Sequence, residues 1–294
     1  MTPSRYRPAL ALAVLVLAPA AGGCSAAGTQ EGGKPDVAVA LYPLAYAVRE
    51  IGGGRVAVEE LTPPGAEPHD LELTPRQVGS VAGAHLVVYL HGLQPAVDEA
   101  VAQNAPRQVL DAAEAVGHHH DTARDPHFWL DPTRYAAFAE AVGEKLAEVD
   151  PAHAGAYRSR AADLVRRLER LDTAFRAGLR ECARRDIVTG HAAFGYLARR
   201  YGLDQTPITG LDPEAAPSPA RLAEVQRLVA ARGVTTLFVE PRASAKTTTT
   251  LAADLGIDTA ALDPIESISD RSRAGYFPAM RENLAHLRDA LSCR

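Results

Sequence analysis

The sequence predicts an α/β protein of two lobes, each a mostly parallel sheet flanked by helices, with one long rigid helix joining them. Three observations predict this fold. Apolar strand runs alternate with helix patterns in both halves of the chain, as in parallel sheets covered by helices. A helical stretch without a strong breaker separates the halves. The 294 residues, 47% of them hydrophobic, suffice for two cores.

The N-terminal segment is expected to lie outside the fold. Residues 1–23 have the pattern of a signal peptide, because the apolar run at 9–20 is too short to span a bilayer as a helix. The stretch "LAPAAGGC" resembles a bacterial lipoprotein cleavage site, although Ala21 stands where leucine is preferred. We therefore predict lipid attachment at Cys24 and a lipid-anchored flexible tether over residues 24–36. The alternative is plain secretion.

The N-terminal lobe is predicted over residues 37–150. Its helices carry start signals: Thr74 and Pro75 are an N-cap and a first helical residue, and Asp131 and Pro132 begin a further helix. Strands are predicted at 37–41, 56–61, 85–90 and 107–111, and helices near 45–52, from 75, at 95–104 and at 132–149.

A connecting helix is predicted over residues 151–181. Its apolar residues are spaced alternately four and three apart, which places them in one stripe along one face. At 1.5 Å per residue the helix would be about 45 Å long, so we expect a strut between the lobes. The stripe consists of Tyr157, Ala161, Leu164, Leu168, Leu171 and Phe175.

The C-terminal lobe is predicted over residues 182–294. Cys182 and Cys293 form an even pair in an exported protein, which favours a disulfide over two separate thiols. Ser218 caps one helix and Gly233 ends it. Strands are predicted at 186–190, 234–240 and 257–263, and helices at 191–203, 218–233, 246–256 and 276–293.

Candidate metal ligands follow the predicted strands. His69 lies in the loop after the second strand and His191 where a later strand ends, while His127, in "DPHFWLDP", precedes a helix N-cap. Asp263 and Glu240 end the last two strands. Ligands of open parallel sheets bind outside the carboxyl ends of the strands, where four of these five residues fall. The alternative is that each is an ordinary surface loop residue.

Three imidazoles and a carboxylate suit a transition metal such as zinc. Glu240 and three other carboxylates near the histidines are candidates for orienting the imidazole rings or for serving as an alternative ligand. These neighbours are Asp70, Asp125 and Asp131.

Four segments carry a resemblance to a known family. "PPGAEPHDLELTP", "DPHFWLDP", "GHAAFGYLARRYGL" and "LDPIES", found between residues 37 and 290, resemble the signature segments of the zinc-specific solute-binding proteins of ABC uptake systems, the ZnuA-like family. The resemblance implies one metal ion between the lobes, held by His69 and His127 from the first lobe and His191 and Asp263 from the second. Manganese-binding relatives tend to carry Glu in place of His191, so Zn²⁺ is expected rather than Mn²⁺. The fourth ligand varies in the family, which leaves Asp263, Glu240 or water.

The stretch "GHHHD" at residues 117–121 resembles a shortened form of the His-rich acidic loop of many zinc-binding members. The resemblance implies an auxiliary loop that collects zinc at low affinity. The alternative is a solvated loop. Its histidines are His118, His119 and His120.

Our interpretation is capture and delivery of Zn²⁺, without catalysis. The loaded protein, expected to be a monomer, would dock on an ABC permease whose cytoplasmic ATPase drives uptake. The lipid anchor would hold it at the outer face of the cytoplasmic membrane. The net charge of −5 argues against nucleic acid as a partner.

Two alternatives stay open. An exported zinc-dependent hydrolase would use three histidines around an open water site with Glu240 as general base. The HExxH and GxSxG motifs of hydrolases are absent from the sequence, and a carboxylate closing the fourth position would leave no site for substrate. A metal-binding surface adhesin, acting in cell adhesion, would suit the lipid anchor equally well.

Overall fold

The computed structural model describes residues 1–2, 33–104, 106–117, 125–241, 246–267 and 275–294. The predicted lipid site at Cys24 and the histidine run at 118–120 lie outside the described residues. Within the described part, no helix combines the length and the apolar character needed to cross a bilayer.

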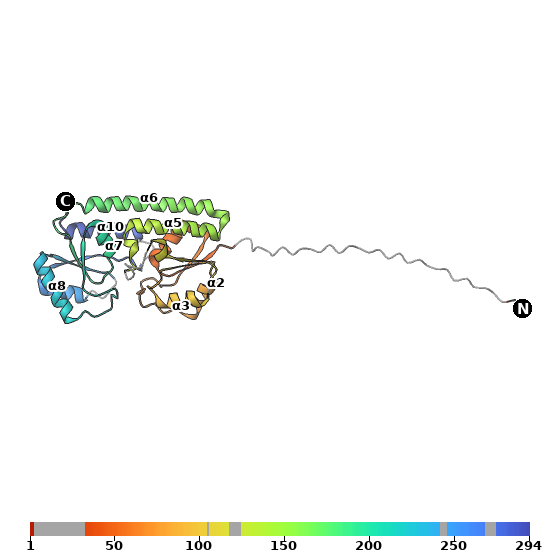
Figure 1. Cartoon of the computed structure of the whole chain (residues 1–294), viewed down its shortest axis with the longest axis horizontal. Coiled ribbons are helices and arrows are strands. Elements are labelled where there is room, and N and C mark those ends of the chain that lie inside the picture. Colours follow the sequence, from red (N-terminus) through yellow and green to blue (C-terminus); the bar gives the residue numbers. More distant parts are fainter. Residues whose placement is uncertain (3–32, 105, 118–124, 242–245, 268–274) are drawn as a thin grey trace. The chain divides into compact units, whose positions relative to one another are not determined.

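Two four-stranded parallel sheets form the two lobes (Figure 1). The strand orders are β2-β1-β3-β4 and β6-β5-β7-β8, so the same topology occurs twice. The central strands are buried on both faces, which explains their continuous apolar runs. The strands are β1 (Asp36–Val39), β2 (Ala57–Glu60), β3 (Leu86–Tyr89), β4 (Val109–Asp111), β5 (Asp186–Thr189), β6 (Asp204–Pro207), β7 (Thr236–Val239) and β8 (Asp258–Ala261).

The helices begin and end where local signals require. Thr74 forms a capping box with Gln77, and the Ser218 hydroxyl accepts a hydrogen bond from the Arg221 amide. Gly233 ends its helix in the left-handed conformation, with φ of 62°. The helices are α1 (Tyr42–Gly52), α2 (Pro75–Gly83), α3 (Pro95–Asn104), α4 (Ala112–Ala115), α5 (Pro132–Val149), α6 (Ala154–Gly178), α7 (Gly195–Tyr201), α8 (Pro219–Arg232), α9 (Lys246–Leu255) and α10 (Tyr276–Ala290), and the 3-10 turns are η1 (Gly53–Arg55), η2 (Phe128–Leu130) and η3 (Pro151–His153).

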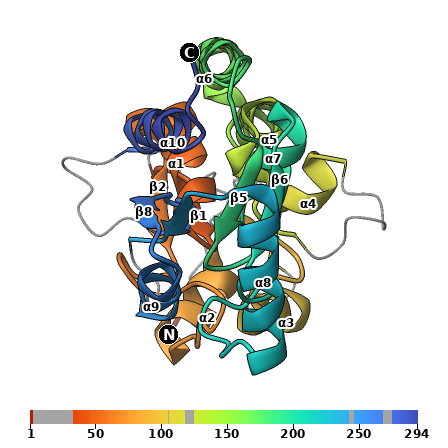
Figure 2. The same ribbon diagram turned by 90° about the vertical axis from the view of Figure 1, so that its left-hand side faces the viewer.

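The connecting helix is α6, and its buried stripe is the one that the sequence predicts. It spans 25 residues, or about 38 Å, because η3 precedes it and the helix ends at Gly178. It packs on α1 and α5 of the first half and on α10 of the second (Figure 2). Gly143 allows the close approach of α5, since a Cβ atom there would lie 2.6 Å from the Ala161 Cβ. Both sheets belong to one unit, Lys34–Arg294, so the lobe boundaries at 150 and 181 stay predictions.

An aromatic cluster joins the two halves of the chain. Tyr135 of α5 and Tyr276 of α10 are buried with ring centroids 4.6 Å apart. Phe128 and Trp129 of η2 pack beside them, with Phe128 centred 6.5 Å from Tyr135. The cluster therefore fixes η2, and with it the preceding His127.

A disulfide joins Cys182 to Cys293, which confirms the predicted pairing. It ties the segment after α6 to the C-terminal end of the chain, across a sequence separation of 111 residues. A loop of this size stabilises the fold by about 4–5 kcal/mol in the chain-entropy model.

Candidate metal centre

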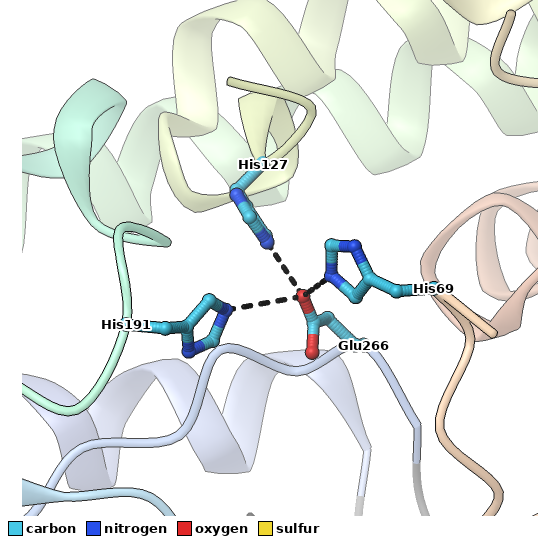
Figure 3. A group of neighbouring side chains, drawn as sticks. All are labelled: His69, His127, His191 and Glu266. Atoms are coloured by element: carbon cyan, nitrogen blue, oxygen red, sulfur yellow. Dashed lines mark hydrogen bonds and ion pairs between the residues drawn. The ribbon is translucent and has the colours of Figure 1, made fainter. Parts of the chain in front are cut away.

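Four side chains from distant parts of the sequence meet between the sheets (Figure 3). They are His69, His127, His191 and Glu266, and one nitrogen or oxygen atom of each lies within 4.8 Å of the corresponding atoms of the others. The last three residues are buried, and His69 is partly exposed. The structure thus brings together the three histidines that the sequence singles out.

Strand ends position these residues. His69 lies in the loop after β2, and His191 follows β5 by two residues. Glu266 lies in the segment after β8, and His127 immediately precedes η2. The carboxyl ends of parallel strands supply three of the four groups, as expected for open α/β sheets.

Glu266 Oε1 lies at the centre of the group. It is 2.5 Å from His127 Nε2 and 3.0 Å from His69 Nε2, both within hydrogen-bond distance. His191 Nε2 is 3.6 Å away, too far for a hydrogen bond. Among the described residues this buried nitrogen has no hydrogen-bond partner, which costs free energy. A cation bound here would use its lone pair.

The donor set fits zinc chemically. Zinc ligands at about 2.0–2.1 Å in a tetrahedron stand roughly 3.4 Å from one another. The four atoms lie within 4.8 Å of one another, so the most distant pairs need to approach by no more than roughly 1–1.5 Å. Glu266 Oε1 would instead move away from His127 Nε2 and His69 Nε2, which lie at 2.5 Å and 3.0 Å. Three imidazole nitrogens and one carboxylate oxygen are a combination that zinc accepts and that all-oxygen cations such as Mg²⁺ do not prefer.

Two carboxylates orient the imidazole rings. Asp125 Oδ1 lies 2.9 Å from His127 Nδ1 and accepts from the His127 amide. Glu240 Oε2 lies 2.5 Å from His191 Nδ1, and its other oxygen accepts from the His191 amide. A carboxylate bound to Nδ1–H leaves the Nε2 lone pair for the centre of the group. Gly190 makes room for Glu240, since a Cβ atom there would lie 2.7 Å from Glu240 Oε1.

The remaining predicted carboxylates lie elsewhere. Asp131 caps α5 by accepting from the Thr133 amide. Asp70 is exposed and does not belong to the group. Asp263, predicted as the fourth ligand, is also outside the group, because its Oδ1 accepts from the Ile265 amide in a tight turn. The turn directs Glu266 inward instead, so the structure places Glu266 where the sequence led us to expect Asp263.

Protons and a cation compete for this group. Burial lowers the pKa of His191, but the hydrogen bond to Glu240 and the nearby Glu266 raise it to about 10. Burial also opposes the charged form of His127, yet Asp125 and Glu266 raise its pKa above the usual value. The pKa of Glu266 is held well below its ordinary range, because the surrounding histidines outweigh its burial. The carboxylate is therefore ionised and ready for a cation.

An acidic pocket of about 90 Å³ opens onto Glu266. Glu67 and Glu214 line it together with Glu240 and Asp263, and the described lining includes no lysine, arginine or histidine. Burial, followed by the negative charge of Glu266, raises the pKa of Glu67. A wall of carboxylates of this kind attracts cations and repels anions.

The fold and this group define a two-lobed protein with a three-histidine, one-carboxylate centre between its parallel sheets. The chain matches the family "Zinc-uptake complex component A periplasmic" over residues 37–290 and belongs to this family.

One relative and two solved structures illustrate the similarity. The chain is 30% identical to the high-affinity zinc uptake system protein ZnuA of Bacillus subtilis, over 95% of both chains. It resembles the Zn(II)-bound ZnuA-like domain of Streptococcus pneumoniae AdcA, with a TM-score of 0.77, 30% identity and coverage of 88% of this chain and 99% of that one. The laminin-binding protein Lmb of Streptococcus agalactiae, described as a bifunctional protein with adhesin and metal transporting activity, gives a TM-score of 0.80 at 28% identity, over 87% of this chain and 99% of that one.

Proposed function

We propose that this protein captures Zn²⁺ outside the cytoplasm and delivers it to an ABC permease in the membrane, with a cytoplasmic ATPase driving uptake. The observation that carries the proposal is the convergence of His69, His127, His191 and Glu266 from both halves of the chain. The zinc uptake and zinc-binding functions in the names of its relatives support it.

The number of protein ligands supports binding without catalysis. Four protein ligands complete a tetrahedral shell and leave no position for a reactive water, whereas catalytic zinc sites keep one open. Glu240, the candidate general base of a hydrolase, uses both carboxylate oxygens to hold His191. The group therefore favours a carrier over an exported zinc hydrolase.

The site of action is the outer face of the cytoplasmic membrane, where the protein works as a monomer. The signal-peptide pattern and the "LAPAAGGC" stretch support export and lipidation at Cys24. Metabolic labelling with a fatty acid tests the anchor: wild type should be labelled and Cys24→Ser should not. Label on both proteins would contradict lipidation at this residue.

Adhesion is a second candidate, favoured by the similarity to Lmb, a laminin-binding protein. Binding of the purified protein to immobilised laminin tests it. Signal no higher than that on albumin would remove this candidate and leave zinc delivery unaffected.

Competitive titration against a zinc-binding dye tests the main proposal. Wild type should bind one Zn²⁺ per chain, and His127→Ala or Glu266→Gln should weaken binding at least about tenfold, or about 1.4 kcal/mol. His91→Ala is the matched control, because His91 is an exposed histidine outside the group. Equal affinity of wild type and Glu266→Gln would refute the assignment of the centre.

A further inference from the structure

The segment that presents Glu266 is held by one side chain of α10. Asn283 is buried, with 2% of its surface exposed. Its Oδ1 accepts from the Asp263 amide at 2.8 Å, and its Nδ2 donates to the Asp263 carbonyl at 2.7 Å. This pair of hydrogen bonds fixes both the position and the direction of the main chain three residues before Glu266.

A tight turn after Asp263 also restricts the main chain between Asp263 and Glu266. The carboxylate of Asp263 accepts from the Ile265 amide at 2.8 Å. Ile265 itself has φ of 60°, a left-handed conformation that is rare for a β-branched residue. Such a conformation persists only where the surroundings enforce it. Here the side chain of Ile265 is fully buried, at 0% exposure, and the turn holds its amide.

The first lobe bonds the same segment through Trp129, which α10 holds in turn. The Trp129 indole donates to the Pro264 carbonyl at 2.8 Å, and the Trp129 carbonyl accepts from the Tyr276 hydroxyl at 2.6 Å. Trp129, Tyr276 and Pro264 are all buried. Glu266 therefore follows a stretch of main chain that is hydrogen-bonded to both α10 and η2, which limits the movement of its carboxylate to its own side-chain torsions.

We propose that Asp263 and Asn283 are positioning residues that hold Glu266 against the three histidines, and that Asp263 sets zinc affinity without touching the ion. The inference rests on the proposed function. Preorganisation is the physical reason: a carboxylate already in place loses less conformational entropy when the cation binds. Groups that orient ligands in this way typically contribute 10–100-fold to metal affinity.

Two substitutions at one position separate a turn-forming role from a ligand role. Asp263→Asn keeps the acceptor oxygen and supports the same turn, but it removes the charge that zinc would bind. Asp263→Ala removes the acceptor. We expect Asp263→Asn to bind Zn²⁺ within about threefold of wild type, and Asp263→Ala to bind about tenfold more weakly or worse. Equal tenfold losses for both variants would overturn the proposal, because a ligand fails in either substitution.

A double-mutant cycle tests Asn283 with a readout that a merely structural role would not move. Zn²⁺ affinity is measured for Asn283→Ala alone and in the Glu266→Gln background. If Asn283 acts through Glu266, the loss of zinc affinity caused by Asn283→Ala should shrink from about tenfold to less than about twofold in the Glu266→Gln background. Equal losses in both backgrounds would overturn the role of Asn283. Circular dichroism checks folding, and the Asp263 pair carries the test if Asn283→Ala does not fold.

The outcomes distinguish this proposal from the proposed function. If wild type does not bind Zn²⁺, or binds it no better than Glu266→Gln, the proposed centre fails and the positioning role fails with it. If wild type binds tightly, Glu266→Gln binds weakly and Asp263→Asn is as weak as Asp263→Ala, only the positioning role is refuted.

Discussion

Replacement of Glu240 is expected to weaken zinc binding although Glu240 does not bind the ion. Its carboxylate makes two hydrogen bonds to His191, at 2.9 Å to the amide and 2.5 Å to Nδ1. Glu240→Ala leaves two buried donors without partners, at about 1–3 kcal/mol each. The His191 amide loses its partner both in the zinc-free and in the zinc-bound protein. The cost at the amide therefore lowers the stability of the fold but does not change the zinc affinity.

The loss of the contact between Glu240 and the His191 ring, in contrast, does change the zinc affinity. Glu240 keeps the Nδ1 proton in place and directs Nε2 to the centre of the group, so its loss should weaken affinity about 10–100-fold, or about 1.4–2.7 kcal/mol. Glu240→Gln retains one acceptor oxygen for two donors, and its affinity should fall between that of wild type and that of Glu240→Ala. Competition against a zinc-binding dye measures the zinc affinities of wild type, Glu240→Ala and Glu240→Gln.

Glu214→Ala is the matched control for these variants. Glu214 lines the pockets next to Glu240, but it is exposed and has no hydrogen bond to His191. We expect its affinity to stay within about twofold of wild type, because the charge of the exposed Glu214 is screened by salt. The reasoning is refuted if Glu240→Ala binds no more weakly than Glu214→Ala.

Three further outcomes follow from the structure. Acidification from pH 8 to pH 6 should weaken zinc binding about 100-fold for each proton released on binding. The reason is that the pKa of His191 is raised to about 10, so its imidazole is protonated throughout this window and must lose a proton when zinc binds. Calorimetry in two buffers of different ionisation enthalpy counts the protons, and an affinity independent of pH would contradict this prediction. Replacing Cys182 and Cys293 by Ser should lower the free energy of unfolding by about 4–5 kcal/mol, measured by denaturant titration, and an unchanged midpoint would count against it. Gly143→Ala should destabilise the fold by about 1–3 kcal/mol, because its Cβ would lie 2.6 Å from Ala161 Cβ, whereas Gly155→Ala, whose Cβ meets nothing within 4 Å, should be neutral or stabilising.

The position of His191 at the edge of the sheet could be predicted from the sequence, because the ends of strands are visible in the local sequence pattern. Apolar runs locate β5 and β7, and parallel pairing then brings the residues that follow these strands to one edge. His191 and Glu240 meet for this reason. Strand ends do not place His127 beside these residues. Its position depends on how η2 packs against the aromatic residues of α5 and α10.

The structure has Glu266 rather than Asp263 as the fourth member of the group for a physical reason. "LDPIES" contains both Asp263 and Glu266, and both could end near the same sheet edge. The choice between them depends on the left-handed conformation of Ile265, which local propensity disfavours for a β-branched residue. Asn283, Trp129 and the burial of Ile265 impose that conformation from distant parts of the sequence.

The edge strand β6 was missed for a related reason. Its sequence, "DQTP", is polar and contains a proline, and both features argue against a strand. At the edge of a sheet a proline is tolerated, and β6 pairs only with β5. The predicted helix at 191–203 begins only at Gly195 for a different reason, since His191 and its neighbours form the loop that carries the site.

The packing between the lobes limits how zinc can be released. A wide hinge opening would have to separate Tyr135 of α5 from Tyr276 of α10 and detach α6 from one of its neighbours. Each large aromatic side chain buries about 150–250 Å², so exposing one costs about 4–6 kcal/mol. A few such rings already cost as much as a typical domain has in total stability. We therefore expect release to proceed by movement of the loop that carries the partly exposed His69, with the helices and the Glu266 segment in place. Hydrogen exchange should then show the amides of the His69 loop slowing on zinc binding while those of α5, α6 and α10 do not change; slowing across α6 would contradict this mechanism.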